Sequence, residues 1–378
     1  MNSSSLSRRG FLLVSAGALA CGTKKATGFP GYCFVANRDG RSIAVVDLNR
    51  FQVRARIPLD AQPSAIVVRD AANPRAFALS QESGAVYEIE PEHLKVSRRV
   101  SIARKASDMR LEPDGKALWI LAREPAALVR VPLDTLRPAH SIGLGAEPES
   151  FELSGDGRAA VSFGNGSLAI VSLQRGSVER VIAGPPPSPV LAFRNDGKLL
   201  MAGSPSERSL IMYDVADGRA VVRLPLPMAP RHLCTTEDGG QLFITGDGSD
   251  AVTIAFPYLT EIEQTILAGH DPGAMTLTST SPAYLLVTNR SAGSVTAIDM
   301  DSRKLVAVVQ VGQEPGAVIM TPDNQYALAL NERSGELAVI RLSTFAEPRV
   351  RRYRTAPLFT MIPVGAGPVS AGVLKFQG

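Results

Sequence analysis

Few residues in this chain have side chains suited to acid–base or metal chemistry. The 378 residues include four histidines, and the sequence contains no HExxH, C-x-x-C-H, GxSxG or P-loop motif. His93 falls in an expected turn and His140 in an expected outer strand, so we interpret both as surface residues. The stretch 246–250, GDGSD, lacks the order of carboxylates of an EF-hand loop and is interpreted as turn chemistry. His232 and His270 are the histidines that remain for a binding site.

These two histidines lie beside a Pro or Gly corner that recurs along the chain before a short apolar run. The residues just before each corner are Gln62, Lys105, Glu147, Pro186, Ala229, Asp271, Glu314 and Gly367. The residues just after each corner are Ser64, Ser107, Glu149, Ser188, Arg231, Gly273, Gly316 and Val369. If the corners converge at one opening, they form a ring of polar loops, which is a common place for a binding site.

The charged residues at or beside this ring define the binding site that we predict. They are Lys105, Asp108, Glu147, Glu149, Arg231, His232, His270, Asp271 and Glu314. Such a funnel could grip a polar ligand or a metal ion. The alternative is that these are solvated loop charges, partly paired with one another. We assign no catalytic residue, no metal site and no cofactor from the sequence.

The corners belong to a repeat that runs through the chain. The residue that ends the first apolar run of each unit recurs at intervals of 40 to 43 residues. These positions are Asn37, Ser80, Ala122, Gly164, Ser204, Gly246, Asn289 and Asn331. After this first apolar run, each unit has a second run in which the residue type alternates along the chain. A third, more polar run follows, and then a fourth run after the Pro or Gly corner. Turns such as EPDGK and SGDGR, which suit tight antiparallel connections, close the units.

Four short strands in about 42 residues are typical of one blade of a β-propeller. No segment has a sustained helical period, which disfavours a parallel α/β fold. The third runs carry Arg and Glu at alternate positions, as suits an outer strand that must not pair with another chain. One blade cannot bury both of its apolar faces alone, so neighbouring blades must stack around an axis. We therefore predict an all-β chain that forms a single β-propeller of four-stranded antiparallel blades.

The repeat predicts eight blades, with seven as the alternative if the last unit is degenerate. The first unit starts at Tyr32, and the chain ends with PVSAGVLKF, residues 368–376, which has the pattern of an inner run. We expect this last run to pair with the N-terminal blade and close the ring without an exposed edge. The final unit is longer than the others, and segment 347–357 accounts for the excess.

The N-terminal segment has the pattern of an export signal. Arg8 and Arg9 precede an apolar run, residues 11–20, which is too short to span about 30 Å of hydrocarbon. The stretch SRRGFL resembles a twin-arginine signal, and ALAC, ending at Cys21, resembles both a cleavage site and a lipobox. We predict a periplasmic or cell-envelope protein, with lipid attachment at Cys21 left open. The predicted signal, linker and propeller are residues 1–21, 22–31 and 32–378.

The composition, with 45% hydrophobic and 20% charged residues, is that of a soluble globular protein. The net charge of +4 is small, and we interpret the basic stretch 349–354 as a solvated edge, so we expect no nucleic-acid partner. Cys33 and Cys234 fall in different units, and we predict no structural disulfide. We expect a monomer that touches a membrane only through an N-terminal lipid.

Three stretches of the sequence share one pattern of residues. They are FVANRDGRSIAVVD, VTNRSAGSVTAID followed by VQVGQEPGAVIMTPDN, and LALNERSGELAVI. This pattern resembles that of the YVTN-repeat β-propeller family, also called YncE-like. The resemblance covers about residues 30–345 and is strongest in the first and last units, because the middle units lack the Asn. It implies a propeller fold and export, and it says little about chemistry.

Three functions are compatible with the sequence. The first is a non-enzymatic scaffold that binds a protein partner or a small polar ligand at the channel mouth. The second is a lactonase-type hydrolase, for which Glu149, Arg231 and His232 are the best candidates. The third is a tetrapyrrole or metal binder, by analogy with the eight-bladed domain of haem-containing nitrite reductase, with His232 or His270 as the axial ligand. We favour the first because the sequence contains no catalytic motif.

Overall fold

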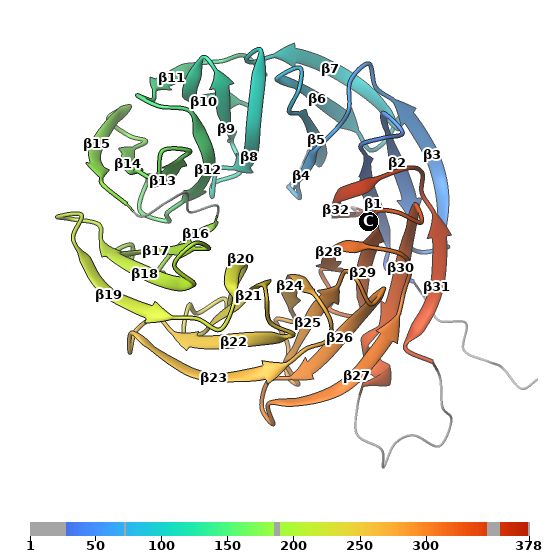
Figure 1. Cartoon of the computed structure of the whole chain (residues 1–378). Helices are drawn as coiled ribbons and strands as arrows, with labels where there is room; N and C mark the ends of the chain where they lie inside the picture. The colour runs from blue at the N-terminus through green and yellow to red at the C-terminus, as the bar shows by residue number, and fades with distance from the viewer. Residues whose placement is uncertain (1–27, 72, 185–189, 346–355, 377–378) are drawn as a thin grey trace, which may run out of the picture.

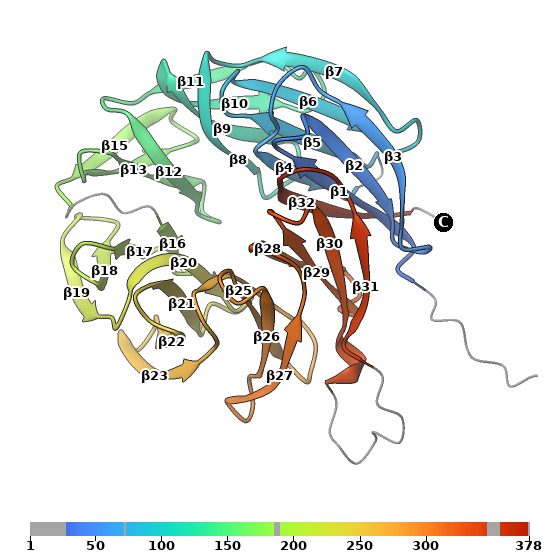
Figure 2. The same ribbon diagram turned by 45° about the vertical axis from the view of Figure 1, so that its right-hand side comes forward.

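The computed structural model describes residues 28–71, 73–184, 190–345 and 356–376, which form eight antiparallel sheets of four strands each. The sheets stand as blades around a central axis, as Figure 1 shows along that axis and Figure 2 from a view turned by 45°. The structure confirms the predicted all-β propeller and the count of eight blades. Among the described residues the one helix is the short 3-10 turn η1 (Leu342–Thr344), and no helix has the length and apolar character to cross a membrane.

We number the blades 1 to 8 and give the strands of each from the axis to the rim. Blades 1 and 2 contain β32 (Pro368–Lys375), β1 (Gly31–Asn37), β2 (Ser42–Asp47), β3 (Gln52–Pro58); and β4 (Ala65–Arg69), β5 (Arg75–Ser80), β6 (Ala85–Glu90), β7 (Lys95–Ser101). Blades 3 and 4 contain β8 (Lys105–Leu111), β9 (Ala117–Glu124), β10 (Ala126–Pro132), β11 (His140–Gly143); and β12 (Pro148–Leu153), β13 (Arg158–Phe163), β14 (Leu168–Ser172), β15 (Ser177–Ile182).

The remaining blades follow the same order. Blades 5 and 6 contain β16 (Val190–Phe193), β17 (Leu199–Ser204), β18 (Ser209–Asp214), β19 (Ala220–Pro225); and β20 (Ala229–Thr235), β21 (Leu242–Asp247), β22 (Ala251–Phe256), β23 (Glu261–Leu267). Blades 7 and 8 contain β24 (Pro272–Leu277), β25 (Tyr284–Asn289), β26 (Ser294–Asp299), β27 (Lys304–Gln310); and β28 (Pro315–Met320), β29 (Tyr326–Asn331), β30 (Glu336–Arg341), β31 (Leu358–Pro363).

The C-terminal strand closes the ring. β32 pairs antiparallel with β1, with Tyr32 opposite Leu374 and Ala36 opposite Ser370. The inner strand of blade 1 therefore comes from the end of the chain, and its other three strands come from the beginning. This confirms the predicted closure, in which β32 covers the inner edge of β1.

The hydrophobic core is divided among the gaps between neighbouring blades. Alternate residues of β1 illustrate how: Cys33 and Val35 pack against blade 8, whereas Phe34 and Ala36 pack against blade 2. Six further apolar clusters join the remaining neighbours in the same way. Because side chains alternate between the two faces of a strand, both faces of every blade are apolar and need a neighbour.

Three buried asparagines lie at these contacts, at the ends of second strands. Asn37, Asn289 and Asn331 are fully buried, and each meets a glycine that follows the outer strand of the preceding blade. A Cβ placed on Gly269 would lie 2.6 Å from Asn289 Cγ, and one on Gly312 would lie 2.5 Å from Asn331 Nδ2. The Asn of one repeat and the Gly of the previous repeat therefore occupy one packed contact between two blades.

The two cysteines of the propeller lie in different blades and are free thiols. Cys33 is buried in blade 1, and burial raises its pKa to about 12. Cys234 is half-buried in blade 6, and burial raises its pKa to about 11. Several residues on which we based predictions lie outside the described part of the chain, namely Arg8, Arg9, Cys21, Pro186, Ser188 and the basic stretch 349–354.

Candidate functional site

The channel mouth is the end of the ring at which the inner strands begin. We define it by the first residues of the inner strands and by the turns between the second and third strands of the blades. The backbone joins these two sets, since Arg38 N–H donates to the Gly367 carbonyl and Arg290 N–H donates to the Asp271 carbonyl. The corner residues that the structure describes, which exclude Pro186 and Ser188, therefore lie at one end of the fold.

Most inner strands contain a β-bulge just after the corner. The pairing register shifts at Ser107, Glu149, Arg231, Gly316 and Val369, and a two-residue irregularity in blade 7 covers Gly273. A bulge adds an unpaired residue and redirects its side chain. The side chains of Glu149 and Arg231 are accordingly exposed at the mouth, although both belong to strands.

Three of the predicted charged residues, Lys105, Glu147 and Arg231, form local ion pairs. Lys105 Nζ lies 2.8 Å from Glu124 Oε1, and Arg231 donates to Asp247 Oδ2 at 2.8 Å. Glu147 forms an ion pair with Arg123. These pairs are exposed and contribute little to stability. They agree with the alternative interpretation, in which the loop charges are partly paired with one another.

Blades 7 and 8 carry a larger network around Arg290. Its guanidinium donates to Glu314 at 2.9 Å and to Glu332 at 3.2 Å. Arg333 lies 3.5 Å from Glu314. The hydrogen bonds that Arg290 donates to Glu332 raise the pKa of Arg290, so the cation is held firmly in its charged form. Of these four residues, only Glu314 was predicted from the sequence.

A hollow of about 830 Å³ opens beside this network. The residues that line it include Asp271, Arg290, Glu314, Arg333, Ser291, Gln310 and Gln313. Ser291 Oγ donates to Asp271 Oδ2 at 2.7 Å. Because the lining holds two cations and two carboxylates with amide and hydroxyl groups between them, it is suited to a polar ligand without a large net charge.

The two candidate histidines have different surroundings. His270 is 72% exposed, and its Nδ1 lies 3.1 Å from Asp250 Oδ1. His232 is half-buried on β20, and among the described residues it has no hydrogen-bond partner. Burial and the adjacent Arg231 lower the pKa of His232, so its imidazole is neutral at pH 7. Its Nε2 faces Gly273 of blade 7, where a Cβ would lie 3.9 Å away.

Asp108 lies further along the wall than the mouth residues. Arg110 Nη2 lies 3.2 Å from Asp108 Oδ2 and 3.6 Å from Glu152 Oε2. Burial raises the pKa of both Asp108 and Glu152, and the single guanidinium between them offsets this only in part. Arg110 and Glu152 were not predicted, although each follows its bulge residue by three positions on the inner strand.

The three candidate residues for a lactonase-type hydrolase are spread over two blades. Arg231 and His232 belong to β20 of blade 6, whereas Glu149 belongs to β12 of blade 4, and blade 5 lies between them. No ion pair or hydrogen bond links Glu149 to either residue in the described part of the chain. Within the same residues, no group of three or more His, Cys, Asp or Glu side chains is arranged to hold a metal ion.

Comparison with known proteins places the chain among the β-propellers. No protein-family model matches it. A stretch of 139 residues, 35% of this chain, is 22% identical to the seven-bladed beta-propeller protein Rv1057 of Mycobacterium tuberculosis. The chain thus spans about a third of the length of the curated relative that it matches.

Solved structures support the same class of fold. Dihydro-heme d1 dehydrogenase NirN in complex with DHE superposes with a TM-score of 0.74 and 15% identity, over 91% of this chain and 75% of NirN. Hydrazine synthase of Kuenenia stuttgartiensis superposes with a TM-score of 0.56 and 20% identity, over 85% of this chain and 99% of that chain. The Cps50 (Swd1) propeller domain of Myceliophteria thermophila superposes with a TM-score of 0.59 and 13% identity, over 74% of this chain and 97% of that domain. At these identities the likeness concerns the fold alone.

Proposed function

We propose that this chain is an exported propeller of the YVTN-repeat type that acts as a binding scaffold at the channel mouth. The observation that carries this proposal is the hollow beside Arg290, which lies among the corner residues of blades 7 and 8. Propeller loops tolerate variation while the blades stay rigid, so a mouth of this kind can be adapted to one partner without change to the fold.

The charges at the mouth favour a particular kind of ligand. Arg290 bonds to both Glu314 and Glu332, so a simple anion would have to displace two carboxylates there. A protein surface or a small polar ligand can instead use the side-chain amides of Gln310 and Gln313 and the hydroxyl of Ser291. We therefore propose a protein partner or a small polar ligand of low net charge.

The scaffold proposal is tested with a crosslinker placed at the mouth. A photoreactive residue at Ser291 should trap a defined partner or ligand in the native envelope. A photoreactive residue at Ala216 should not, because Ala216 lies in the turn between β18 and β19 of blade 5, at the end of the ring opposite to the mouth. Arg290→Gln should reduce the yield at Ser291, and Arg219→Gln, which removes an exposed paired arginine far from the mouth, should leave it unchanged. Equal labelling from both positions would refute a site at the mouth.

A tetrapyrrole at the channel is the second candidate, and His232 is the observation that favours it. Its half-buried, neutral imidazole has no hydrogen-bond partner among the described residues, so a ring nitrogen could bind the iron of a haem. The similar structure NirN is described in complex with DHE. In this chain His232 would hold the iron of the tetrapyrrole and the cofactor would supply any redox chemistry.

Absorption spectroscopy tests this second candidate. Purified protein from the native envelope should show a visible band, or free hemin should give a saturable spectral shift with the mature chain. His232→Ala should abolish the shift, and His270→Ala, which removes an exposed histidine paired with Asp250, should retain it. A colourless protein that leaves the hemin spectrum unchanged rules the tetrapyrrole out and leaves the scaffold proposal intact.

We also propose that the chain reaches the cell envelope through its N-terminal segment and stays there as a monomer. Replacement of Arg8 and Arg9 by Lys should leave the precursor in the cytoplasm if a twin-arginine route is used. Labelling with a radioactive fatty acid that is lost in Cys21→Ser would support a lipid anchor. Recovery of unlabelled, cleaved protein from the periplasmic fraction would favour simple removal of the signal.

A further inference from the structure

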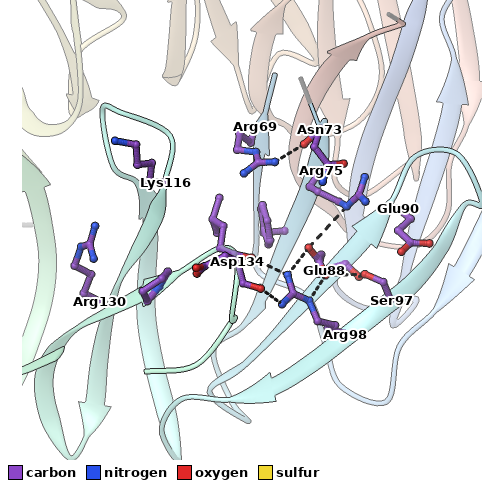
Figure 3. Close-up of a pocket in the computed structure, with 13 residues that line it drawn as sticks. Arg69, Asn73, Arg75, Glu88, Glu90, Ser97, Arg98, Lys116, Arg130 and Asp134 are labelled. Carbon is purple, nitrogen blue, oxygen red and sulfur yellow. Dashed lines mark hydrogen bonds and ion pairs between the residues drawn. The ribbon is translucent and has the colours of Figure 1, made fainter. Parts of the chain in front are cut away.

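A groove of about 740 Å³ lies between blades 2 and 3 (Figure 3). It is at the end of the ring opposite to the channel mouth, because the inner strand β4 ends there, at Arg69. Its walls come from the end of β4, Asn73 and Arg75 at the start of β5, the adjoining ends of β6 and β7, Lys116 just before β9, and the end of β10 with the residues that follow it. Five cationic and three carboxylate side chains line it, namely Arg69, Arg75, Arg98, Lys116, Arg130, Glu88, Glu90 and Asp134.

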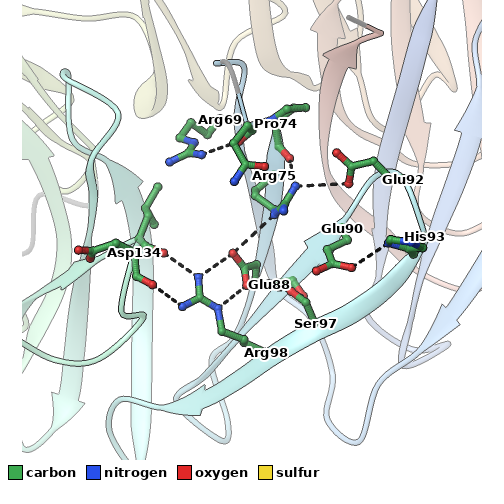
Figure 4. A network of polar contacts seen from close by, with 12 residues as sticks. Arg69, Pro74, Arg75, Glu88, Glu90, Glu92, His93, Ser97, Arg98 and Asp134 are labelled. Atoms are coloured by element: carbon green, nitrogen blue, oxygen red, sulfur yellow. Dashed lines mark hydrogen bonds and ion pairs between the residues drawn. The ribbon is translucent and has the colours of Figure 1, made fainter.

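One wall of the groove is fixed by Glu88. This carboxylate is only 5% exposed and accepts hydrogen bonds from Arg98 Nε at 2.5 Å and Ser97 Oγ at 2.8 Å (Figure 4). Burial works against its charge, but these bonds outweigh burial and hold the pKa of Glu88 below its ordinary value. Arg98 also donates to the carbonyls of Leu133 and Asp134, both at 2.7 Å, which ties blade 2 to blade 3.

Four of the five cations have a carboxylate partner. Arg98 and Arg75 share Glu88, and Arg75 also reaches Glu92 at 3.3 Å. Arg130 donates to Glu112 through two nitrogens, at 3.1 and 2.6 Å. Lys116 lies 3.3 Å from Asp114, but this pair is largely exposed and therefore weak. The amine of Lys116 is thus available to a competing anion.

Arg69 differs from the other cations. Its Nη2 donates to the Asn73 carbonyl at 2.5 Å, and among the described residues its guanidinium forms no ion pair. Its Nε is buried without a hydrogen-bond partner, and Nη1 makes no hydrogen bond to a described residue. A half-buried guanidinium that uses one of its donors retains both charge and hydrogen-bonding capacity for a ligand.

We propose that this groove binds a small anionic ligand, whose carboxylate or phosphate oxygens accept hydrogen bonds from Arg69 and Lys116. Figure 3 shows Arg69 on the blade 2 side of the groove and Lys116 on the blade 3 side. Charge-assisted hydrogen bonds to a planar guanidinium are among the stronger polar contacts of proteins. The hydrogen bonds of Glu88 with Arg98 and Ser97 hold another wall of the groove in place. The volume admits a ligand of metabolite size rather than a single ion.

Titration calorimetry of the mature protein tests the proposal, with inorganic phosphate and citrate as separate probes at constant ionic strength. We expect Arg69→Gln to weaken binding by about tenfold or more, the effect of losing one charge-assisted hydrogen bond. Lys116→Gln should weaken it as well, and it provides a second measurement if R69Q folds poorly. The matched control is Arg54→Gln, which removes an equal charge from an exposed position on β3 of blade 1.

The outcomes separate the sources of the anion. Tight binding of phosphate alone supports a phosphoryl ligand, and tight binding of citrate alone supports a carboxylate ligand. The proposal is wrong if neither probe binds with a Kd of about 1 mM or below. It is also wrong if R69Q and R54Q weaken binding equally, because the effect is then general screening of charge rather than recognition in the groove.

Discussion

The contact between Gly312 and Asn331 should make Gly312 sensitive to the addition of a single methyl group. Its backbone is not in the left-handed region, so an alanine there has no conformational penalty of its own. The added methyl group would nevertheless lie 2.5 Å from Asn331 Nδ2 and 2.6 Å from Ser334 Oγ. Ser334 is exposed and can rotate away, whereas Asn331 is fully buried between blades 7 and 8.

We expect Gly312→Ala to reduce the free energy of unfolding by about 1–3 kcal/mol, the usual cost of overpacking a close-packed contact. Gly145→Ala is the matched control, because a Cβ there meets no atom within 4 Å and its backbone is also outside the left-handed region. That control should be neutral or slightly stabilising, since alanine restricts the unfolded chain. Urea unfolding, followed through the fluorescence of buried Trp119, measures both.

A double-mutant cycle separates the steric cause from a general weakness of the loop. Asn331→Ala opens the space that the new methyl group needs, so the double mutant should lose less stability than the sum of the two single mutants, by about 1 kcal/mol or more. Two results would refute the reasoning: G312A as stable as G145A, or strictly additive effects of G312A and N331A.

Three further predictions follow from the surroundings of titratable groups. Glu88→Gln should destabilise the fold by about 1–3 kcal/mol at pH 7 through loss of the bonds from Arg98 and Ser97. The pKa of Glu88 is lower in the folded state than in the unfolded state. Its carboxylate therefore stabilises the fold above about pH 4.3, the pKa of an unfolded glutamate, and this stabilisation is lost as the pH falls further. An equal loss of stability for E88Q at pH 7 and pH 3, measured by urea unfolding, would contradict this. Asp108→Asn should match or exceed the wild type in stability at pH 7. The pKa of Asp108 is raised in the folded state, so its charge costs stability as the pH rises through that pKa. The stability gained by D108N should disappear below about pH 4, where the carboxyl is protonated in both states. A D108N variant less stable than the wild type at pH 7 would contradict the raised pKa. Cys33 and Cys234, with pKa values of about 12 and 11, should react with a thiol reagent at pH 8 only after denaturation, and rapid labelling of the native protein would show that burial does not protect them.

The sequence by itself determined the architecture. Alternation of apolar residues with a period of two, and turn residues at fixed offsets, are local signals, and their recurrence about every 42 residues predicts the blades directly. The apolar C-terminal run predicted the closure through β32 because a ring would otherwise leave an unpaired edge. The corner residues were also predicted to converge, because the inner strand of every blade begins at the same end of the ring.

The tertiary structure alone decided what those corner residues do. Sequence position shows that Glu314 lies at the mouth, but its partner Arg290 belongs to the preceding blade, and side chains 24 residues apart in the chain meet only once the blades are packed. The same holds for Arg98, which reaches across to carbonyls of blade 3, and for His232, whose neighbour Gly273 comes from blade 7. The repeat fixes backbone positions, whereas polar contacts depend on side-chain geometry between blades, which has no period in the sequence.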